Sequence, residues 1–238
     1  MIKLFRIAAV LLCIIGLLVG YEQYAENNAT REYTQWEALQ ASKSKKNPYR
    51  ILVDVEEAKL YLLENGVLKK SYPCAGGKYT TPSPIGTWKI ISKDTWGEGF
   101  GGRWMGFNVP WGKFGIHGTI YPNSIGWSSS KGCIRMFNKD VKDLYNIVPH
   151  GTRVTIVDGP FGPFGRGIRS LDPGEYGADV MEVQKKLKEL GYYYGGIDGK
   201  YGEGMKAAVH KYQKDHKLPV GNKISTRMIE QLGFFEFE

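Results

Sequence analysis

Two short segments are the most informative part of the sequence: Phe114-Gly115-Ile116-His117-Gly118-Thr119 and Ser130-Lys131-Gly132-Cys133-Ile134-Arg135-Met136. Each combines apolar residues typical of a buried strand with one reactive side chain, the imidazole of His117 or the thiol of Cys133. A base beside a thiol makes an activated nucleophile, because the base holds the sulfur as the thiolate that attacks carbonyl carbons. The pair therefore predicts acyl transfer by a cysteine nucleophile.

The residues around these segments are patterned as β-strands, with apolar residues alternating and turn residues between them. On these patterns, further strands are expected at 49–55, 59–63, 67–75, 87–92, 103–109 and 153–157. Asn65-Gly66 is a strong signal for a two-residue hairpin. Apolar residues at helical spacing after Asn138, taken as the N-cap, predict one helix. We expect residues 49–158 to form a mainly β domain with a short helix after Cys133.

A candidate flap lies between two of these strands. Residues 93–102 contain Trp96, Phe100 and several glycines, a composition that can form a mobile cover over a site. Trp104, which follows directly, is the third flap candidate. The alternative is that these large aromatic side chains simply pack the sheet.

The last part of the chain has a helical period. Residues 159–174 are rich in Gly and Pro and predict a linker, after which residues 175–238 are expected to form three short helices in a small all-α binding domain. Asp179 and Glu182 resemble a capping box, and Ser225 is placed to start the third helix.

The N-terminus is typical of an export or anchoring segment. Lys3 and Arg6 precede an apolar run from Ile7 to Val19, and no clean cleavage site follows. We expect residues 1–20 to be an uncleaved transmembrane helix, with residues 21–48 as a stalk and the remainder outside the cytoplasm. The alternative is a cleaved signal peptide, which would leave a secreted protein.

Composition narrows the classes of partner. The net charge of +8 suits nucleic acid, an anionic membrane surface or an anionic wall polymer. No basic cluster lies in a helix-turn-helix or finger pattern, so a nucleic acid is the least favoured of these and we expect none. Cys13, Cys74 and Cys133 are too few and too oddly placed for a disulfide framework. The histidines lack zinc-ligand spacing, and we expect no metal or other cofactor.

These motifs resemble two known families. Residues 49–158 resemble the L,D-transpeptidase (YkuD-type) catalytic domain, and residues 175–238 resemble a three-helix peptidoglycan-binding domain. The first resemblance is carried by His117, Gly118, Thr119, Ser130, Gly132, Cys133 and Arg135. The second is carried by Leu190-Gly191-Tyr192-Tyr193 and Ile197-Asp198-Gly199, among shorter matches. The resemblance implies a β-sandwich for the catalytic domain and peptidoglycan as the partner of both domains.

The resemblance also implies a mechanism. The thiolate of Cys133 would attack a stem-peptide carbonyl, expel the terminal D-Ala and leave a thioester. An amine from a neighbouring stem would resolve it into a 3→3 cross-link, whereas water would make the protein an L,D-carboxypeptidase. A carbapenem would acylate the same thiol. A third interpretation is a non-catalytic peptidoglycan-binding protein, against which the intact His117 and Cys133 argue.

The resemblance assigns roles to the neighbours of this pair. The Gly118 carbonyl would hold the second ring nitrogen of His117, and amides near Gly132 and Cys133 would form the oxyanion hole. The remaining candidates for substrate contact are Ser130, Thr119, Arg135 and Lys131. Lys131 stands where the family motif commonly has a second histidine, so it either raises the local positive potential or faces solvent.

Overall fold

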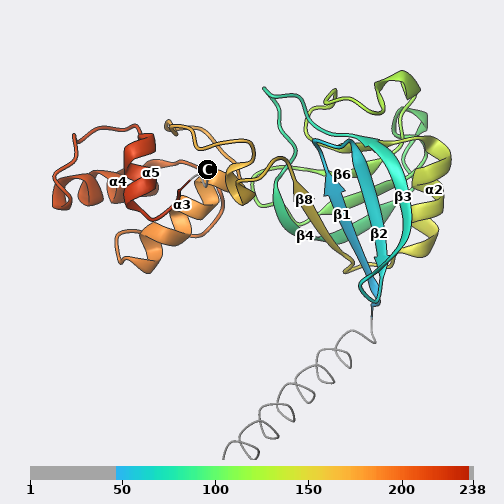
Figure 1. The fold of residues 1–238 in the computed structure, drawn as a ribbon, viewed down its shortest axis with the longest axis horizontal. Helices are drawn as coiled ribbons and strands as arrows, with labels where there is room; N and C mark the ends of the chain where they lie inside the picture. Colours follow the sequence, from blue (N-terminus) through green and yellow to red (C-terminus); the bar gives the residue numbers. More distant parts are fainter. Residues whose placement is uncertain (1–46, 236–238) are drawn as a thin grey trace, which may run out of the picture. The chain divides into compact units, whose positions relative to one another are not determined.

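Eight β-strands close into a barrel in this computed structural model, which describes residues 47–235 (Figure 1). The order around the barrel is β1-β2-β3-β7-β6-β5-β4-β8. The strands are β1 (Tyr49–Asp54), β2 (Lys59–Glu64), β3 (Val67–Ala75), β4 (Gly86–Asp94), β5 (Trp104–Phe107), β6 (Gly115–His117), β7 (Ile134–Met136) and β8 (Arg153–Val157). The expected anchor and most of the stalk lie outside the described residues. Within those residues, no helix has the length and apolar character needed to cross a membrane.

The expected β-sandwich is wrong, because two long strands join its two sheets into one closed surface. Residues 67–73 of β3 pair with β2, whereas Cys74 and Ala75 pair with β7. In the same way, residues 86–89 of β4 pair with β8 and the rest of β4 pairs with β5. A register shift at Ile90/Ser92 accompanies the change of partner in β4, as bulges do where strands bend. A second shift, at Leu62/Leu63, lies within the pairing of β2 with β3.

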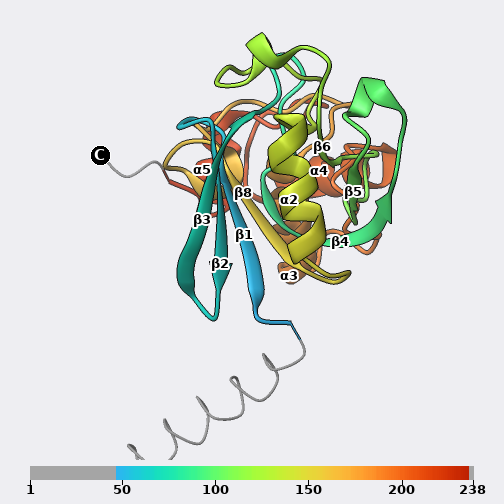
Figure 2. The same cartoon turned by 90° about the vertical axis from the view of Figure 1, so that its right-hand side faces the viewer.

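Local sequence signals explain individual elements of the barrel. Asn65 and Gly66 have φ values of 52° and 83°, the left-handed pair that a tight hairpin between β2 and β3 requires. The helix α2 (Asn138–Ile147) buries Val141 and Leu144 against the barrel core, and it lies beside β6 (Figure 2). Its N-cap is Phe137 rather than Asn138, with no side-chain cap.

Three α-helices follow in the described C-terminal region: α3 (Ala178–Glu189), α4 (Glu203–Asp215) and α5 (Thr226–Gln231). Ser225 caps α5 by accepting a hydrogen bond from the Met228 amide, as predicted. The predicted capping box at α3 is absent, since its N-cap is Gly177 and the Asp179 carboxylate pairs instead with Arg169.

The core of this helical region extends into the expected linker. Leu171 is fully buried in the helical core, and Phe164 and Ile168 pack against it. The Phe164 ring lies 4.9 Å from that of Phe234, between ring centroids. These apolar side chains anchor the second half of the Gly/Pro-rich segment, which the glycine and proline content alone did not indicate.

Candidate active site

Strand register brings Cys133 and His117 to one face of the barrel. Strands β6 and β7 are parallel, with Ile116 opposite Ile134 and His117 opposite Arg135. Cys133 directly precedes β7 and so occupies the position beside Gly115. Because side chains alternate along a strand, Cys133, Arg135 and His117 share one face. The structure therefore brings the two predicted reactive residues together from separate segments.

The imidazole of His117 is held by its own neighbour and enclosed by aromatic rings. Its Nδ1 lies 2.5 Å from the Gly118 carbonyl oxygen, which can only accept, so Nδ1 carries the hydrogen and the free lone pair is on Nε2. The Phe100 and Trp104 rings lie 4.9 and 5.8 Å from the imidazole, between centroids. His117 is 6% exposed, and this burial, with a smaller effect of Arg135, holds the pKa of the imidazole below its ordinary value.

The thiol of Cys133 is half-buried and favours its neutral form. Burial raises the pKa of this thiol, while the Gly115 amide and the Arg135 guanidinium act against that rise. Among the described residues no hydrogen bond joins Cys133 to His117, and such bonds often tighten only when substrate binds. Both pKa shifts favour the neutral forms, an unprotonated imidazole and a protonated thiol, over the thiolate that the sequence predicts.

Ser130 organises the turn that carries the thiol. Its Oγ donates to the Cys133 carbonyl at 2.6 Å and accepts the Gly132 amide at 2.9 Å. Its backbone carbonyl accepts hydrogen bonds from Lys78 and Thr81. Because the Gly132 amide is already bonded, the expected role of that amide in an oxyanion hole is not supported by this geometry.

The other predicted site residues differ in burial and in their hydrogen-bond partners. Thr119 is buried, and its Oγ1 accepts the Tyr121 amide, which makes it a support of the loop. Lys131 is exposed on the turn, whereas Arg135 is half-buried and close enough to affect the pKa of both His117 and Cys133. Cys74 is buried in the barrel core with its pKa raised to about 12 by burial, as an unreactive thiol would be.

The three flap candidates differ in their burial and in their position relative to His117. Trp104 is only 2% exposed on β5, opposite His117, so it belongs to the wall of the site and not to a flap. Trp96 stacks on Trp104 at 4.5 Å between centroids, and the Lys113 ammonium lies 4.2 Å from the Trp96 ring centroid. Phe100, in the short helix Glu98–Phe100, is 38% exposed, and its ring meets the imidazole in an edge-on contact.

Asn138 is the site residue that the sequence did not reveal. Its Oδ1 accepts a hydrogen bond from the Thr119 amide at 2.8 Å. That amide belongs to the same peptide group as the Gly118 carbonyl, which holds the imidazole of His117. An asparagine at the start of a helix is ordinarily a cap, and only the tertiary contact distinguishes this one.

Two protein-family models match parts of this chain. The family model described as the L,D-transpeptidase catalytic domain matches residues 48–156, and one described as a putative peptidoglycan binding domain matches residues 176–231. The putative L,D-transpeptidase YkuD of Bacillus subtilis is 47% identical over 110 residues, covering 46% of this chain and 66% of that protein. The putative L,D-transpeptidase YqjB of the same species is 31% identical over 128 residues, which cover 47% of this chain and 72% of YqjB.

The chain belongs to the L,D-transpeptidase family. Among solved structures, an L,D-transpeptidase from Mycobacterium smegmatis is similar with a TM-score of 0.40 and 20% identity, over 46% of this chain and 58% of that one. The chain thus spans just under two thirds of the YkuD relative and less of the solved structure.

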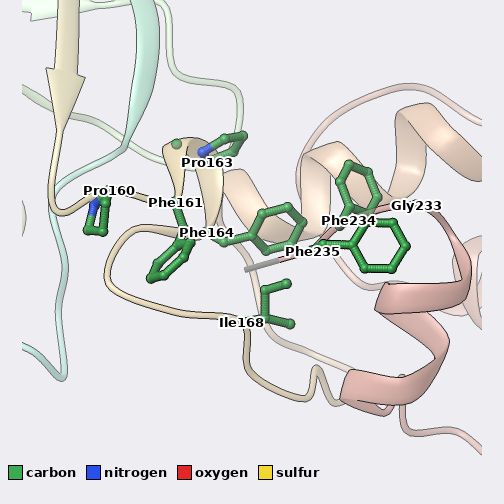
Figure 3. A pocket seen from close by; sticks show the side chains of 9 residues that line it. Pro160, Phe161, Pro163, Phe164, Ile168, Gly233, Phe234 and Phe235 are labelled. Atoms are coloured by element: carbon green, nitrogen blue, oxygen red, sulfur yellow. The ribbon is translucent and has the colours of Figure 1, made fainter. Parts of the chain in front are cut away.

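A pocket of about 320 Å³ in the C-terminal region is separate from the candidate active site. It is lined by Pro160, Phe161, Gly162, Pro163, Phe164, Ile168, Gly233, Phe234 and Phe235 (Figure 3). None of these side chains ionises or acts as a nucleophile, so the pocket offers no catalytic group of its own. Within the described part of the chain, no group of three or more His, Cys, Asp or Glu residues could hold a metal ion.

Gly132 offers a test of how tightly the thiol must be positioned. Its φ is 104°, and a Cβ there would lie 2.6 Å from the Phe114 ring and 2.9 Å from the Pro82 carbonyl oxygen. We expect Gly132→Ala to slow iodoacetamide alkylation of Cys133 at least tenfold, because a small displacement of a reacting group is costly.

Gly126→Ala is the matched control. Gly126 also has a positive φ, of 93°, but a Cβ at this position would have no other atom within 4 Å. Both variants should lose about 1 kcal/mol of stability from backbone strain. Only Gly132→Ala should lose reactivity, and equal alkylation rates in the two variants would contradict the tight packing of the turn.

Proposed function

We propose that the protein is an L,D-transpeptidase that cleaves and rejoins peptidoglycan stem peptides through a thioester on Cys133. The observation that carries this proposal is the shared face of Cys133 and His117, with Nδ1 of His117 bonded to the Gly118 carbonyl. That bond leaves Nε2 as the atom that takes the proton of the thiol. Membership of the L,D-transpeptidase family supports the stem peptide as the substrate class.

In the proposed first step, Cys133 passes its proton to His117 Nε2 as the sulfur attacks the carbonyl carbon of the third stem residue. The bond to the terminal D-Ala breaks, and that amine leaves with the proton from His117. In the second step, an amine of a neighbouring stem attacks the thioester, gives its proton to His117 and forms the 3→3 cross-link. The thiol is restored when the imidazolium returns the proton.

Arg135 is the proposed electrostatic partner of the substrate. Burial is the main cause of the lowered pKa of His117, and the Arg135 guanidinium lowers it further. The same guanidinium opposes the rise that burial causes in the pKa of the Cys133 thiol. A fixed positive charge at this place can also pair with the free carboxylate of the stem. Lys131, exposed on the same turn, is a weaker candidate for that role.

A defined tetrapeptide muropeptide tests the reaction. Incubation with the full-length protein, followed by mass spectrometry, should show release of D-Ala and a cross-linked dimer. Tripeptide without dimer would assign an L,D-carboxypeptidase instead. If neither product formed, the enzymatic proposal would fail and the non-catalytic wall-binding alternative would remain.

The helical region is proposed to hold the enzyme on the wall polymer. Its support is the match of residues 176–231 to a putative peptidoglycan binding domain. Two regions directed at one polymer raise the effective concentration of the site on its substrate without new chemistry. This proposal locates the action at the cell wall, outside the cytoplasm, with residues 1–20 as an anchor or export segment.

We expect a protein that ends at Asp158 to sediment poorly with purified sacculi yet to be acylated by a carbapenem at a rate within about twofold of the full-length rate. The cut is placed there because Phe164, Ile168 and Leu171 belong to the helical core and would otherwise be left exposed. Acylation slowed several-fold, with sacculus binding unaltered, would contradict the tether and indicate that the helical region acts on the catalytic site.

A further inference from the structure

One peptide group beside the catalytic histidine is held at both of its ends. The carbonyl oxygen of Gly118 accepts the hydrogen of His117 Nδ1 at 2.5 Å. The amide of Thr119, which belongs to the same peptide group, donates to Asn138 Oδ1 at 2.8 Å. The Gly118-Thr119 peptide therefore links the imidazole to a side chain on a different element, the first residue of α2.

The packing around this peptide fixes the Asn138 carboxamide oxygen in place. A Cβ at Gly118 would lie 2.4 Å from Asn138 Oδ1, and one at Gly101 would lie 2.1 Å from the same atom. The Gly118 amide also donates to the Phe100 carbonyl at 2.9 Å. The Asn138 oxygen thus lies against the backbone of two glycines that have no side chain to obstruct it.

The Asn138 side chain bonds to this peptide and does not cap its own helix, α2. The N-terminus of α2 has no side-chain cap hydrogen bond, and its cap residue is Phe137. The favourable contact that an asparagine ordinarily makes with its own helix is replaced by one with the loop after β6. This placement points to a role in the orientation of His117.

In a Cys-His pair, the orientation of the imidazole matters for proton transfer. When His117 takes the thiol proton it becomes an imidazolium, and its Nδ1 hydrogen then needs a strong, well-aimed acceptor. Here that acceptor is a neutral peptide carbonyl. A carbonyl accepts more strongly when the amide of the same peptide is itself donating, because successive hydrogen bonds polarise one another.

We infer that Asn138 is a positioning residue of this site: it fixes the Gly118-Thr119 peptide, and through its carbonyl it orients and supports the imidazole of His117. The inference rests on the proposed function for its biological meaning, but the geometry concerns the His117 and Cys133 pair alone. Asn138 itself does not touch the reacting atoms.

The charged groups around His117 determine what a substitution should do. Arg135 on β7 and the thiol of Cys133 share its face, and Lys113 lies beyond the Trp96 and Trp104 rings. The flap and β5 present the rings of Phe100 and Trp104 to the imidazole. Asp140 lies in the first turn of α2, the helix that carries Asn138. A carboxylate introduced at position 138 would add a further negative charge next to the peptide that holds the imidazole, and it would favour the imidazolium.

The test uses full-length protein and three variants, Asn138→Ala, Asn138→Asp and Asn146→Ala. Asn146 lies on the same helix and serves as the matched control. Two rates are measured from pH 4 to 9: carbapenem acylation of Cys133 by intact mass, and iodoacetamide alkylation of Cys133 by peptide mapping. The second requires no stem peptide, so it reports on the pair even if the proposed function fails.

We expect Asn138→Ala to slow acylation about ten- to hundredfold at neutral pH, with Asn146→Ala unchanged. Asn138→Asp keeps the acceptor oxygen, so its plateau rate should stay near the wild type, while its acid limb moves to higher pH. An Asn138→Ala protein within twofold of the wild type, with the same pH profile, would overturn the inference. So would an Asn138→Asp protein as slow as Asn138→Ala with an unshifted acid limb, because a purely structural loss would then explain both.

Discussion

Replacement of Cys133 by alanine is expected to reduce stem-peptide turnover on the order of 10⁶-fold, the scale typical for loss of an enzyme nucleophile. The sulfur forms the covalent bond in both proposed steps, and the other thiol of the described residues, Cys74, is buried in the barrel core. The barrel should stay intact, because Cys133 is half-buried on a turn that Ser130 holds. Turnover is measured as D-Ala release, and the melting temperature is recorded with it.

Cys74→Ala is the matched control for that experiment. Cys74 lies in the barrel core, and burial, with a smaller effect of Asp54, raises its pKa to about 12. Its loss should lower stability slightly and leave turnover within about twofold of the wild type. If Cys133→Ala kept its turnover while Cys74→Ala lost it, the roles of the two thiols would have to be exchanged.

Replacement of His117 by alanine is expected to slow carbapenem acylation of Cys133 by about 10²- to 10⁴-fold at neutral pH, because general base catalysis contributes that much. In the wild type, acylation should fall at low pH as the imidazole becomes protonated. Burial holds the pKa of His117 below 6.5, so this acid limb should lie below pH 6.5.

The pH profile of the His117→Ala variant should differ in a defined way. Without a base the thiol must ionise by itself, and burial holds its pKa above the ordinary 9.0. The rate should therefore rise about tenfold per pH unit through neutral pH and continue to rise above pH 9. A His117→Ala profile with the acid limb and plateau of the wild type would show that another group removes the proton.

Local signals account for what the sequence predicted well. The Asn65-Gly66 hairpin needs only two residues with positive φ, and Ser225 caps α5 through a contact three residues away. The hydrogen bond between His117 Nδ1 and the Gly118 carbonyl, implied by the family resemblance, is confirmed and is equally short in sequence. Such features depend on neighbouring residues and little else.

Features that depend on distant pairing were the ones missed. Closure of the barrel requires β4 to pair with both β8 and β5, which no alternation within β4 can indicate. Trp104 resembles a flap residue by its place after a glycine-rich segment, yet its strand pairing with His117 buries it. Asn138 bonds to Thr119, 19 residues away, and the same residue type would serve equally well as a helix cap.

The capture of an acyl-enzyme is the most direct test of the account. Full-length protein mixed with a tetrapeptide muropeptide and quenched in acid within one turnover should gain the mass of the donor minus D-Ala. Peptide mapping should then locate that mass on Cys133 as a thioester that hydroxylamine removes. Turnover without any covalent adduct, or with the adduct on another residue, would contradict the central claim that Cys133 is the acyl-carrying nucleophile.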